Sequence, residues 1–317
     1  MTWGMLEKVF VRGTITTLTG LRVGGSEQGL DAAALENLVA RHALLDEPYI
    51  PGSSLRGKMR CLLERLQGIA GPPVDGVGFG PADDPVHPLV QLFGMMSKDG
   101  AGMPSRVMVR DALLTAESRK RLGRLRGVLP MTETKAEALI DRVTAAATAR
   151  TVERLPAGAE LRFELVLDVR ALPERQVAVA SDVVVTEGAT AGDPTVTTSA
   201  VPAPALPAAW LLEVQRASRN EENGWGRDED LRWLLTGLDL IQDDVIGGHG
   251  SRGYGRVKIR VDGVTHRTRD DYLQGRPERA LEGLAGDLSG RVQSINERGE
   301  RERQEILASL PAIEAGR

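Results

Sequence analysis

The sequence predicts an α+β protein with a ferredoxin-like core, in which the elements follow the order strand, helix, strand, strand, helix, strand (βαββαβ). Two kinds of pattern lead to this fold class. Four segments are rich in β-branched and apolar residues and have the length of strands, at residues 9–17, 105–114, 160–169 and 255–261. Two others repeat apolar residues every three or four positions, at residues 53–66 and 228–240.

The first helix begins after Pro51 and Gly52, which interrupt the preceding segment. Ser53 or Ser54 can accept hydrogen bonds from its first amides. Three cations lie off its apolar stripe: Arg56, Lys58 and Arg60. A helix start has free amides and a partial positive charge, so these residues predict a binding site for a sugar-phosphate backbone. A capped surface helix with solvated charges is the alternative.

The segments between these elements have distinct compositions. Residues 26–46 are acidic and have a helical pattern. Residues 68–88 are rich in Gly and Pro and are interpreted as a loop, and ordered structure is expected again at residues 89–96. Residues 132–154 place apolar side chains among cations, with small residues between them, which is typical of a projecting hairpin. Residues 180–223 are rich in Thr, Ala, Pro and Gly and are interpreted as a long insertion.

The C-terminal part of the chain is highly charged and has a helical composition. The chain is therefore divided into residues 1–261, which hold the core with its hairpin and insertion, and residues 262–317, a charged helical extension. The order of the core elements is also that of the RNA-recognition motif, although the aromatic residues that stack bases in that motif are missing here.

A glycine-rich segment, GGHGSRGYG at residues 247–255, separates the second helix from the last strand. Five of its nine residues are glycine, which lets backbone amides approach a ligand closely. The segment matches neither Gly-x-Gly-x-x-Gly before a helix nor a loop ending in Gly-Lys-Ser/Thr, so a nucleotide cofactor is not supported. Together with Arg22, in the glycine-rich turn after the first strand, it predicts contacts with phosphate groups.

Composition limits the function classes further. The 317 residues are 41% hydrophobic and carry a formal net charge of -4, so nucleic-acid binding requires local basic patches. The single cysteine excludes disulfides and a cysteine-based zinc site within the chain. The sequence shows neither a signal-peptide core nor an apolar run long enough to span a bilayer, and we expect a cytoplasmic protein.

Six collinear segments carry a resemblance to a known family: residues 18–26 (LTGLRVGGS), 48–60 (PYIPGSSLRGKMR), 132–135 (TETK), 140–144 (IDRVT), 152–154 (VER) and 247–255. Together they resemble the RAMP-superfamily backbone subunit of type III CRISPR effector complexes, specifically the Csm-type subunit. The resemblance covers most of residues 9–261.

The resemblance implies a subunit that polymerises along a CRISPR guide RNA, with related backbone subunits, a large polymerase-like subunit and a small helical subunit as partners. Residues 132–154 match the thumb-like hairpin, which displaces one nucleotide of the guide–target duplex at regular intervals. The RNA-binding residues expected on this basis are Arg22, Ser53, Ser54, Arg56, Lys58, Arg60, Lys135, Arg142, Arg150, Arg154, Gly250, Ser251, Arg252 and Gly253.

The resemblance also implies cleavage of target RNA at each displaced position, by an acidic residue after the first strand and a divalent metal, expected to be Mg²⁺. An ungapped alignment on residues 19–21 and 51–54 places Glu36 where the family has its catalytic aspartate. Glutamate is longer by one methylene, and a misplacement of about 1 Å can cost on the order of a hundredfold in rate. Asp31 is the second candidate. The reaction is attack of the ribose 2′-hydroxyl on its adjacent phosphate.

Two other functions fit the same sequence. One is a structural subunit that binds the guide and cleaves nothing, which the replacement of aspartate by Glu36 favours. The other is a CRISPR-RNA processing endoribonuclease of the same fold, in which the imidazole of His249 would be catalytic.

Overall fold

The structure is a computed structural model that describes residues 4–24, 38–72, 78–84, 87–95, 102–125, 129–171, 226–282, 284 and 286–310. The insertion expected at residues 180–223 lies outside these ranges. Within them, no helix is long and apolar enough to cross a membrane.

An antiparallel sheet with the strand order β2, β6, β1, β7, β8 forms the centre of the molecule. Strand β1 (Gly4–Thr17) pairs with β6 (Glu160–Ala171) on one side and with β7 (Val257–Thr268) on the other. Short strands extend the sheet: β2 (Val107–Val109) and β3 (Leu113–Leu114) pair with β6, and β8 (Arg279–Ala280) pairs with β7. Side chains alternate between the two faces, so each long strand presents one face to the core.

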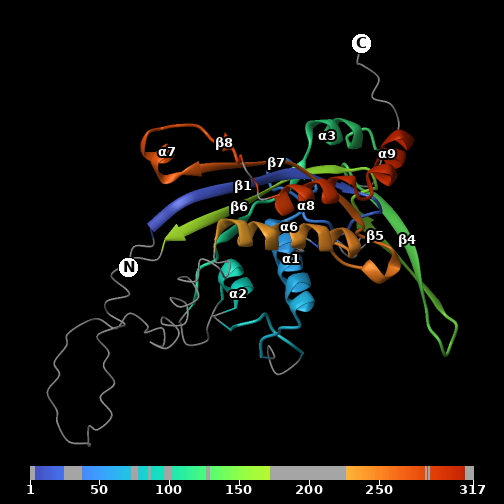
Figure 1. Cartoon of the computed structure of the whole chain (residues 1–317). Helices are drawn as coiled ribbons and strands as arrows, with labels where there is room; N and C mark the ends of the chain where they lie inside the picture. Colours follow the sequence, from blue (N-terminus) through green and yellow to red (C-terminus); the bar gives the residue numbers. More distant parts are fainter. Residues whose placement is uncertain are drawn as a thin grey trace, which may run out of the picture.

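Helices α1 (Gly52–Gln67) and α6 (Arg227–Asp243) cover the apolar face of this sheet (Figure 1). Ile15, Leu161 and Ile259 lie opposite one another on three neighbouring strands and are buried there. Gly237 allows the two helices to approach, since a Cβ atom at this position would lie 2.3 Å from Met59 Cγ. Helices α2 (Pro88–Phe93) and α3 (Ala116–Leu122) lie outside this pair.

The C-terminal segment belongs to the same core. Strand β7 continues to Thr268, so the strand end expected at residue 261 is wrong. The chain goes on through α7 (Arg269–Leu273), α8 (Gly286–Glu297) and α9 (Glu300–Ser309), and α8 buries Leu288 and Ile295. The side chain of Asn296 pairs with the backbone of Val261 on the outer edge of β7. Helix α8 thereby covers a strand edge that would otherwise expose unpaired backbone groups.

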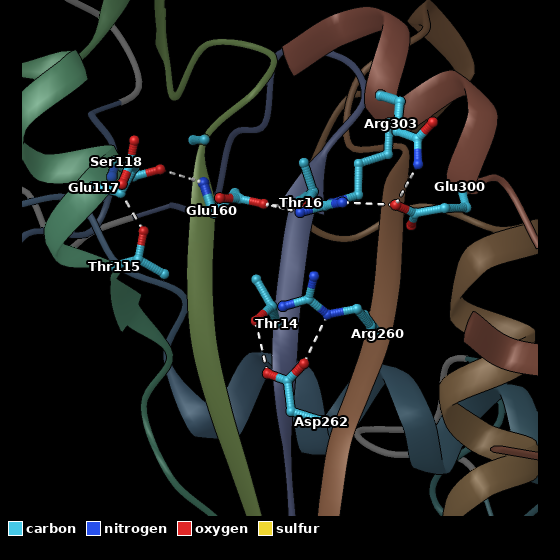
Figure 2. Close-up of polar contacts among 12 residues, drawn as sticks. Thr14, Thr16, Thr115, Glu117, Ser118, Glu160, Arg260, Asp262, Glu300 and Arg303 are labelled. Atoms are coloured by element: carbon cyan, nitrogen blue, oxygen red, sulfur yellow. Dashed lines mark hydrogen bonds and ion pairs between the residues drawn. The ribbon is translucent and has the colours of Figure 1, made fainter. Parts of the chain in front are cut away.

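The second face of the sheet is polar (Figure 2). Thr14 on β1 donates a hydrogen bond to Asp262 on β7, and Asp262 also pairs with Arg260. Helix α9 is attached to this face through Arg303, which binds Glu160 of β6 at 2.6 Å and Thr16 of β1 at 3.2 Å. Polar contacts and ion pairs therefore link the strands and α9 on this face, next to the buried apolar pair Phe10 and Val166.

Strands β4 (Glu133–Ile140) and β5 (Ala147–Arg154) form a separate two-stranded hairpin that projects away from the sheet (Figure 1). Its turn is closed by Asp141, whose carboxylate accepts hydrogen bonds from the backbone N–H groups of Val143 and Thr144. The hairpin expected at residues 132–154 is confirmed, and it is named the thumb hairpin below.

Two other expectations differ from the structure. Residues 38–46, part of the segment expected to be helical, instead form isolated bridges and a turn, because Val39 pairs with Gly24 and Arg41 with Pro48. The strand expected at residues 105–114 is broken into β2 and β3, since Asp111 turns toward the start of α1. The α+β class, the antiparallel sheet and the helical C-terminal part are confirmed.

Candidate nucleic-acid interface

The glycine loop, residues 247–255, is packed against the end of β1. Gly248 N–H donates to Arg22 O at 2.9 Å, and Gly255 N–H donates to Gly20 O at 3.0 Å. Gly247 has φ = 79°, and a Cβ atom there would lie 2.0 Å from Arg22 O. Glycine is required at this position by both its backbone angle and its neighbour. Backbone hydrogen bonds therefore attach the loop to the fold, and these glycines allow it to pack against the turn after β1.

The four expected RNA-binding residues of this loop have different surroundings. A Cβ atom at Gly250 would lie 2.3 Å from Val245, whereas one at Gly253 would meet nothing within 4 Å. Ser251 and Arg252 are exposed in the short turn η2 (Gly250–Arg252). The exposed side of the loop is therefore formed by Ser251, Arg252 and Gly253.

Cations from three segments converge beside this loop, at the root of the thumb hairpin. We call this group the hairpin-root cluster; it consists of Arg22, Lys135, Glu137, Arg150, Arg154, His249, Arg252 and Tyr254. Arg22 comes from the turn after β1, the next four residues from β4 and β5, and the last three from the glycine loop. The sequence predicted Arg22, Lys135, Arg150, Arg154 and Arg252 as RNA ligands, and the structure brings these five together.

Tyr254 is the centre of the cluster, with 1% of its surface exposed. Its hydroxyl donates to Glu137 Oε1 at 2.6 Å. Lys135 Nζ and the Arg154 guanidinium lie 4.8 and 5.2 Å from the centroid of its ring, and the His249 ring meets its edge at 5.6 Å. The tyrosine therefore joins the glycine loop to the thumb hairpin through one hydrogen bond and two cation–π contacts.

The electrostatics of the cluster are dominated by positive charge. Four cationic side chains pair with two carboxylates: Lys135, Arg150 and Arg252 with Glu137, and Arg154 with Glu133 at 2.7 Å. Burial, followed by the charge of Arg150, lowers the pKa of Arg22. Burial, followed by the charge of Arg22, lowers the pKa of His249, which keeps its imidazole neutral at pH 7.

The cations of α1 are divided between two places. Lys58 Nζ binds Asp244 Oδ1 at 3.0 Å, which ties α1 to the end of α6 just before the glycine loop. Arg60 is engaged within the fold, where it binds Glu64 at 2.6 Å and two backbone carbonyls at 2.7 and 2.8 Å. Arg56 stacks on Phe93 and donates to its carbonyl.

Arg56 and Arg60 line a pocket of about 650 Å³ beside α2, together with Pro81, Ala82, Asp83, Phe93, Gly94, Met95, Met103 and Ser105. This pocket is mainly apolar. The structure thus places Lys58 toward the glycine loop and the two arginines toward α2.

The start of α1 differs from the expected serine cap. The helix begins after Pro51 without a side-chain cap, and Gly52 N–H donates to Asp111 Oδ1 at 2.7 Å. Ser53 is exposed and Ser54 half-buried. The capping role expected for these serines is wrong, because a carboxylate from the segment between β2 and β3 reaches the helix start instead.

At the tip of the thumb hairpin, Arg142 is exposed next to two apolar side chains. Val143 has 94% of its surface exposed and Ile140 63%. Exposed apolar residues at the end of a projecting hairpin are typical of a surface that contacts a partner.

The candidate catalytic residues Asp31 and Glu36 lie outside the described residues. The chain that follows them is firmly attached, since the backbone N–H of Val39 donates to the Glu153 carboxylate at 2.8 Å. Glu153 is fully buried and also binds Arg41 and Thr132, each at 2.7 Å. The segment leaving residue 37 is therefore anchored at the root of the thumb hairpin.

The described part of the chain holds no group of three or more His, Cys, Asp or Glu side chains that could bind a metal ion. The residues seen here therefore do not by themselves form a metal centre. Sequence reasoning also missed the roles of Glu137, Tyr254, Asp111 and Glu153, which depend on contacts with residues distant in the chain. Tyr254 and Glu153 did carry a signal, because they lie in the glycine loop and in the VER segment at residues 152–154.

Comparison with known proteins identifies the class to which this fold and cationic cluster belong. Residues 14–258 match the model of the RAMP superfamily, and the chain therefore belongs to that superfamily.

Relatives within the superfamily bear a common name. The chain is 32% identical over 254 residues to the CRISPR system Cms endoribonuclease Csm3 of Mycobacterium tuberculosis, a match covering 80% of this chain and 86% of the relative. The protein of the same name from Methanocaldococcus jannaschii is 28% identical over 296 residues, covering 92% and 91%. That from Streptococcus thermophilus is 31% identical over 240 residues, covering 75% and 81%. The resemblance to the Csm-type subunit is confirmed.

Solved structures of type III complexes include similar chains. One is in a crystal structure of a Csm3–Csm4 subcomplex of the type III-A CRISPR-Cas interference complex, with 21% identity, 92% of this chain and 98% of the other covered, and a TM-score of 0.44. Another is in the cryo-EM structure of a type III-B Cmr-β complex bound to cognate target RNA, with 13% identity, 83% and 61% covered, and a TM-score of 0.46.

Proposed function

We propose that this protein is a CRISPR-RNA-binding backbone subunit of a type III interference complex, which polymerises along the guide and cleaves complementary target RNA at regular intervals. The single observation that carries the proposal is the hairpin-root cluster, in which Arg22, Arg150 and Arg252 come together from three segments. The relatives named as Csm3 endoribonucleases support it.

The proposal includes the finer description of the fold. The elements β1, α1, β2, β6, α6 and β7 follow the ferredoxin-like order βαββαβ, and the sheet order β2, β6, β1, β7 supports this assignment. Residues 1–261 then form the palm with its thumb hairpin and insertion, and β7 continues the palm sheet to Thr268. The rest of the C-terminal segment forms an extension, and its contribution of Leu288 and Ile295 to the core supports an attached rather than a separate unit.

Guide binding rests on charge. Phosphate groups held by Lys and Arg release bound counterions, so a compact group of cations binds a polynucleotide even when the whole chain is acidic. The open half of the glycine loop, with Ser251 and Arg252, lies beside these cations. The expected ligands on α1 (Ser53, Ser54, Arg56 and Lys58) and in the thumb hairpin (Arg142) extend this surface. Arg60 is the weakest candidate, because its donors are already engaged.

Cleavage is assigned to Glu36, with Asp31 as the second candidate. The exposed tip of the thumb hairpin, Ile140 and Val143, unstacks one nucleotide, and the cations hold the phosphates on either side. The carboxylate takes the proton of the ribose 2′-hydroxyl, whose oxygen forms a bond to phosphorus as the bond to the 5′-oxygen breaks. The leaving 5′-oxygen takes a proton from water, so the products are a 2′,3′-cyclic phosphate and a 5′-hydroxyl.

A divalent cation, proposed to be Mg²⁺, is part of this assignment. When bound, it supplies positive charge next to the reacting phosphate. No residue is assigned as its ligand, and the described residues hold no group of three or more His, Cys, Asp or Glu side chains that could bind it.

The proposed partners are the guide RNA, the complementary target RNA, further backbone subunits, the large polymerase-like subunit and the small helical subunit. The similar chains in a Csm3–Csm4 subcomplex and in a target-bound Cmr-β complex support a multisubunit assembly with RNA.

The test is target cleavage by the assembled complex. Wild-type complex with a matching target RNA and magnesium should give a regular ladder of products, and Glu36→Ala or Asp31→Ala should abolish it, which identifies the carboxylate. Glu36→Asp serves as the matched control, because it keeps the carboxylate. A wild-type complex that binds the target but gives no ladder would make the protein a structural subunit. Cleavage of free repeat RNA by the isolated protein, lost in His249→Ala, would make it a processing nuclease.

A further inference from the structure

Glu137 is a single carboxylate placed among the cations that are proposed to bind the guide. Its side chain has 13% of its surface exposed and is held by the Tyr254 hydroxyl at 2.6 Å. Three cations surround it: Lys135 Nζ at 3.6 Å, Arg150 Nη2 at 3.5 Å and Arg252 Nη1 at 3.8 Å. It therefore neutralises part of a charge excess that spans the thumb hairpin and the glycine loop.

The distances show that the cations surround this carboxylate without forming short hydrogen bonds to it. Charge-assisted hydrogen bonds are usually about 2.7 to 2.9 Å long. The three cation contacts of Glu137 are all longer, whereas its bond to the neutral Tyr254 hydroxyl is short. Arg150 and Arg252 are thus held only loosely by the same Glu137 oxygen, which leaves their donors able to bind another anion such as a phosphodiester group.

We infer that Glu137 is an exchangeable counter-anion, which occupies the position of one backbone phosphate in the RNA-free protein and gives it up when the guide binds. This inference rests on the proposed function and adds a second role to the same site. The carboxylate keeps Arg150 and Arg252 close together despite their like charge. It also competes with any polynucleotide, so binding is weaker than the cations alone would allow.

Removal of the charge is the direct test. In Glu137→Gln the side chain keeps its size and can still accept the Tyr254 hydrogen bond through its amide oxygen. Without a carboxylate to displace, we expect the full-length variant to bind a single-stranded RNA oligonucleotide about three- to tenfold more tightly than wild type. Because the phosphate takes the same position in both proteins, the slope of log K against log salt should stay unchanged. Fluorescence anisotropy titrations between about 50 and 200 mM salt measure both quantities.

Glu117→Gln is the matched control. It removes the same charge, but Glu117 pairs with Arg121 on α3, outside the hairpin-root cluster, and is 60% exposed. Binding by Glu137→Gln that equals the binding by Glu117→Gln, or that is weaker than wild type, would overturn the exchange. The proposed function fails separately, through absence of RNA binding by the wild-type protein.

A second measurement does not depend on the variant folding. A cryo-EM map of the guide-bound complex should show the Glu137 carboxylate turned away and a phosphate within hydrogen-bonding distance of Arg150 and Arg252. A map in which Glu137 still accepts from Tyr254 and lies between the two arginines, with the guide present, would contradict the inference.

Discussion

At the scale of single residues, buried polar side chains decide how the candidate site is assembled. Glu153 is fully buried, yet it binds Arg41, Thr132 and the backbone of Val39, and so connects the thumb hairpin to the chain that follows the candidate catalytic segment. Buried carboxylates persist only when such partners satisfy them. Periodicity in the sequence shows none of this, because Thr132 and Glu153 are far from Val39 and Arg41 in the chain.

We expect Glu153→Ala to lower the free energy of unfolding by about 3 kcal/mol, because it removes the shorter of the two ion pairs of the partly buried Arg41 and leaves the Val39 N–H without an acceptor. Urea denaturation measures the change. Glu133→Ala, which removes a more exposed ion pair from the same hairpin, should cost less than about 1 kcal/mol. Equal losses in the two variants would mean that the Glu153 contacts contribute little.

Lys258 supplies a pH-dependent test. It is buried on β7, its ammonium donates to the Ile295 carbonyl, and burial lowers its pKa to about 8. Between pH 8 and about 10.5 the unfolded chain binds more protons at this residue than the folded one, so the free energy of unfolding rises with pH in this window. The contribution is at most about 3 kcal/mol and is flat below pH 8.

Urea denaturation from pH 7 to 11 of wild type and Lys258→Met should therefore diverge above pH 8, with the rise missing in the variant. Lys8→Met, which removes a half-buried ammonium from the neighbouring strand β1, is the control. Parallel curves for wild type and Lys258→Met would contradict the lowered pKa.

At the scale of elements, the thumb hairpin and the glycine loop were recognisable from sequence, but their relation was not. Apolar side chains set among cations, with small residues between them, predicted the hairpin, and glycine content predicted the loop. The helical pattern of residues 26–46 was misleading where the chain is described, because residues 38–41 pair with neighbouring backbone. Tertiary pairing overrode local propensity there.

The tip of the thumb hairpin can be tested apart from its root. Ile140→Asn with Val143→Asn changes exposed side chains, so thermal stability and guide binding should stay unchanged. The ladder of target cleavage should weaken at least several-fold, because polar, smaller side chains unstack a nucleotide less well. Leu273→Asn, an exposed apolar residue on α7, is the control and should leave the ladder intact. A full ladder with the double variant would remove the tip from the mechanism.

At the scale of the whole molecule, an acidic chain with a net charge of -4 concentrates positive charge at one place. The second face of the sheet carries balanced ion pairs such as Arg260 with Asp262 and Arg303 with Glu160. The hairpin-root cluster keeps an excess of cations. The asymmetry predicts that RNA binds at the root of the thumb hairpin and not on the sheet.

Replacing Arg150 and Arg252 by glutamine should weaken binding of single-stranded RNA at least tenfold and reduce its salt slope by about 1.4, since each lost phosphate contact removes about 0.7. Arg260→Gln with Arg301→Gln removes the same charge from the second sheet face and α9, and should change affinity less than twofold. Fluorescence anisotropy at several salt concentrations compares the two double variants. Equal affinities and equal salt slopes would contradict the predicted binding site.

The sequence by itself determined the α+β class, the positions of the main helices and strands, the projecting hairpin and the set of cations around Tyr254, because periodicity, turn chemistry and family resemblance are encoded in short segments. The tertiary structure alone decided that Glu137 and Tyr254 lie at the centre of those cations, that Asp111 rather than a serine occupies the start of α1, and that Arg60 is engaged within the fold. These outcomes depend on which distant side chains packing brings within a few ångströms of each other, and charge interactions change sharply over that range.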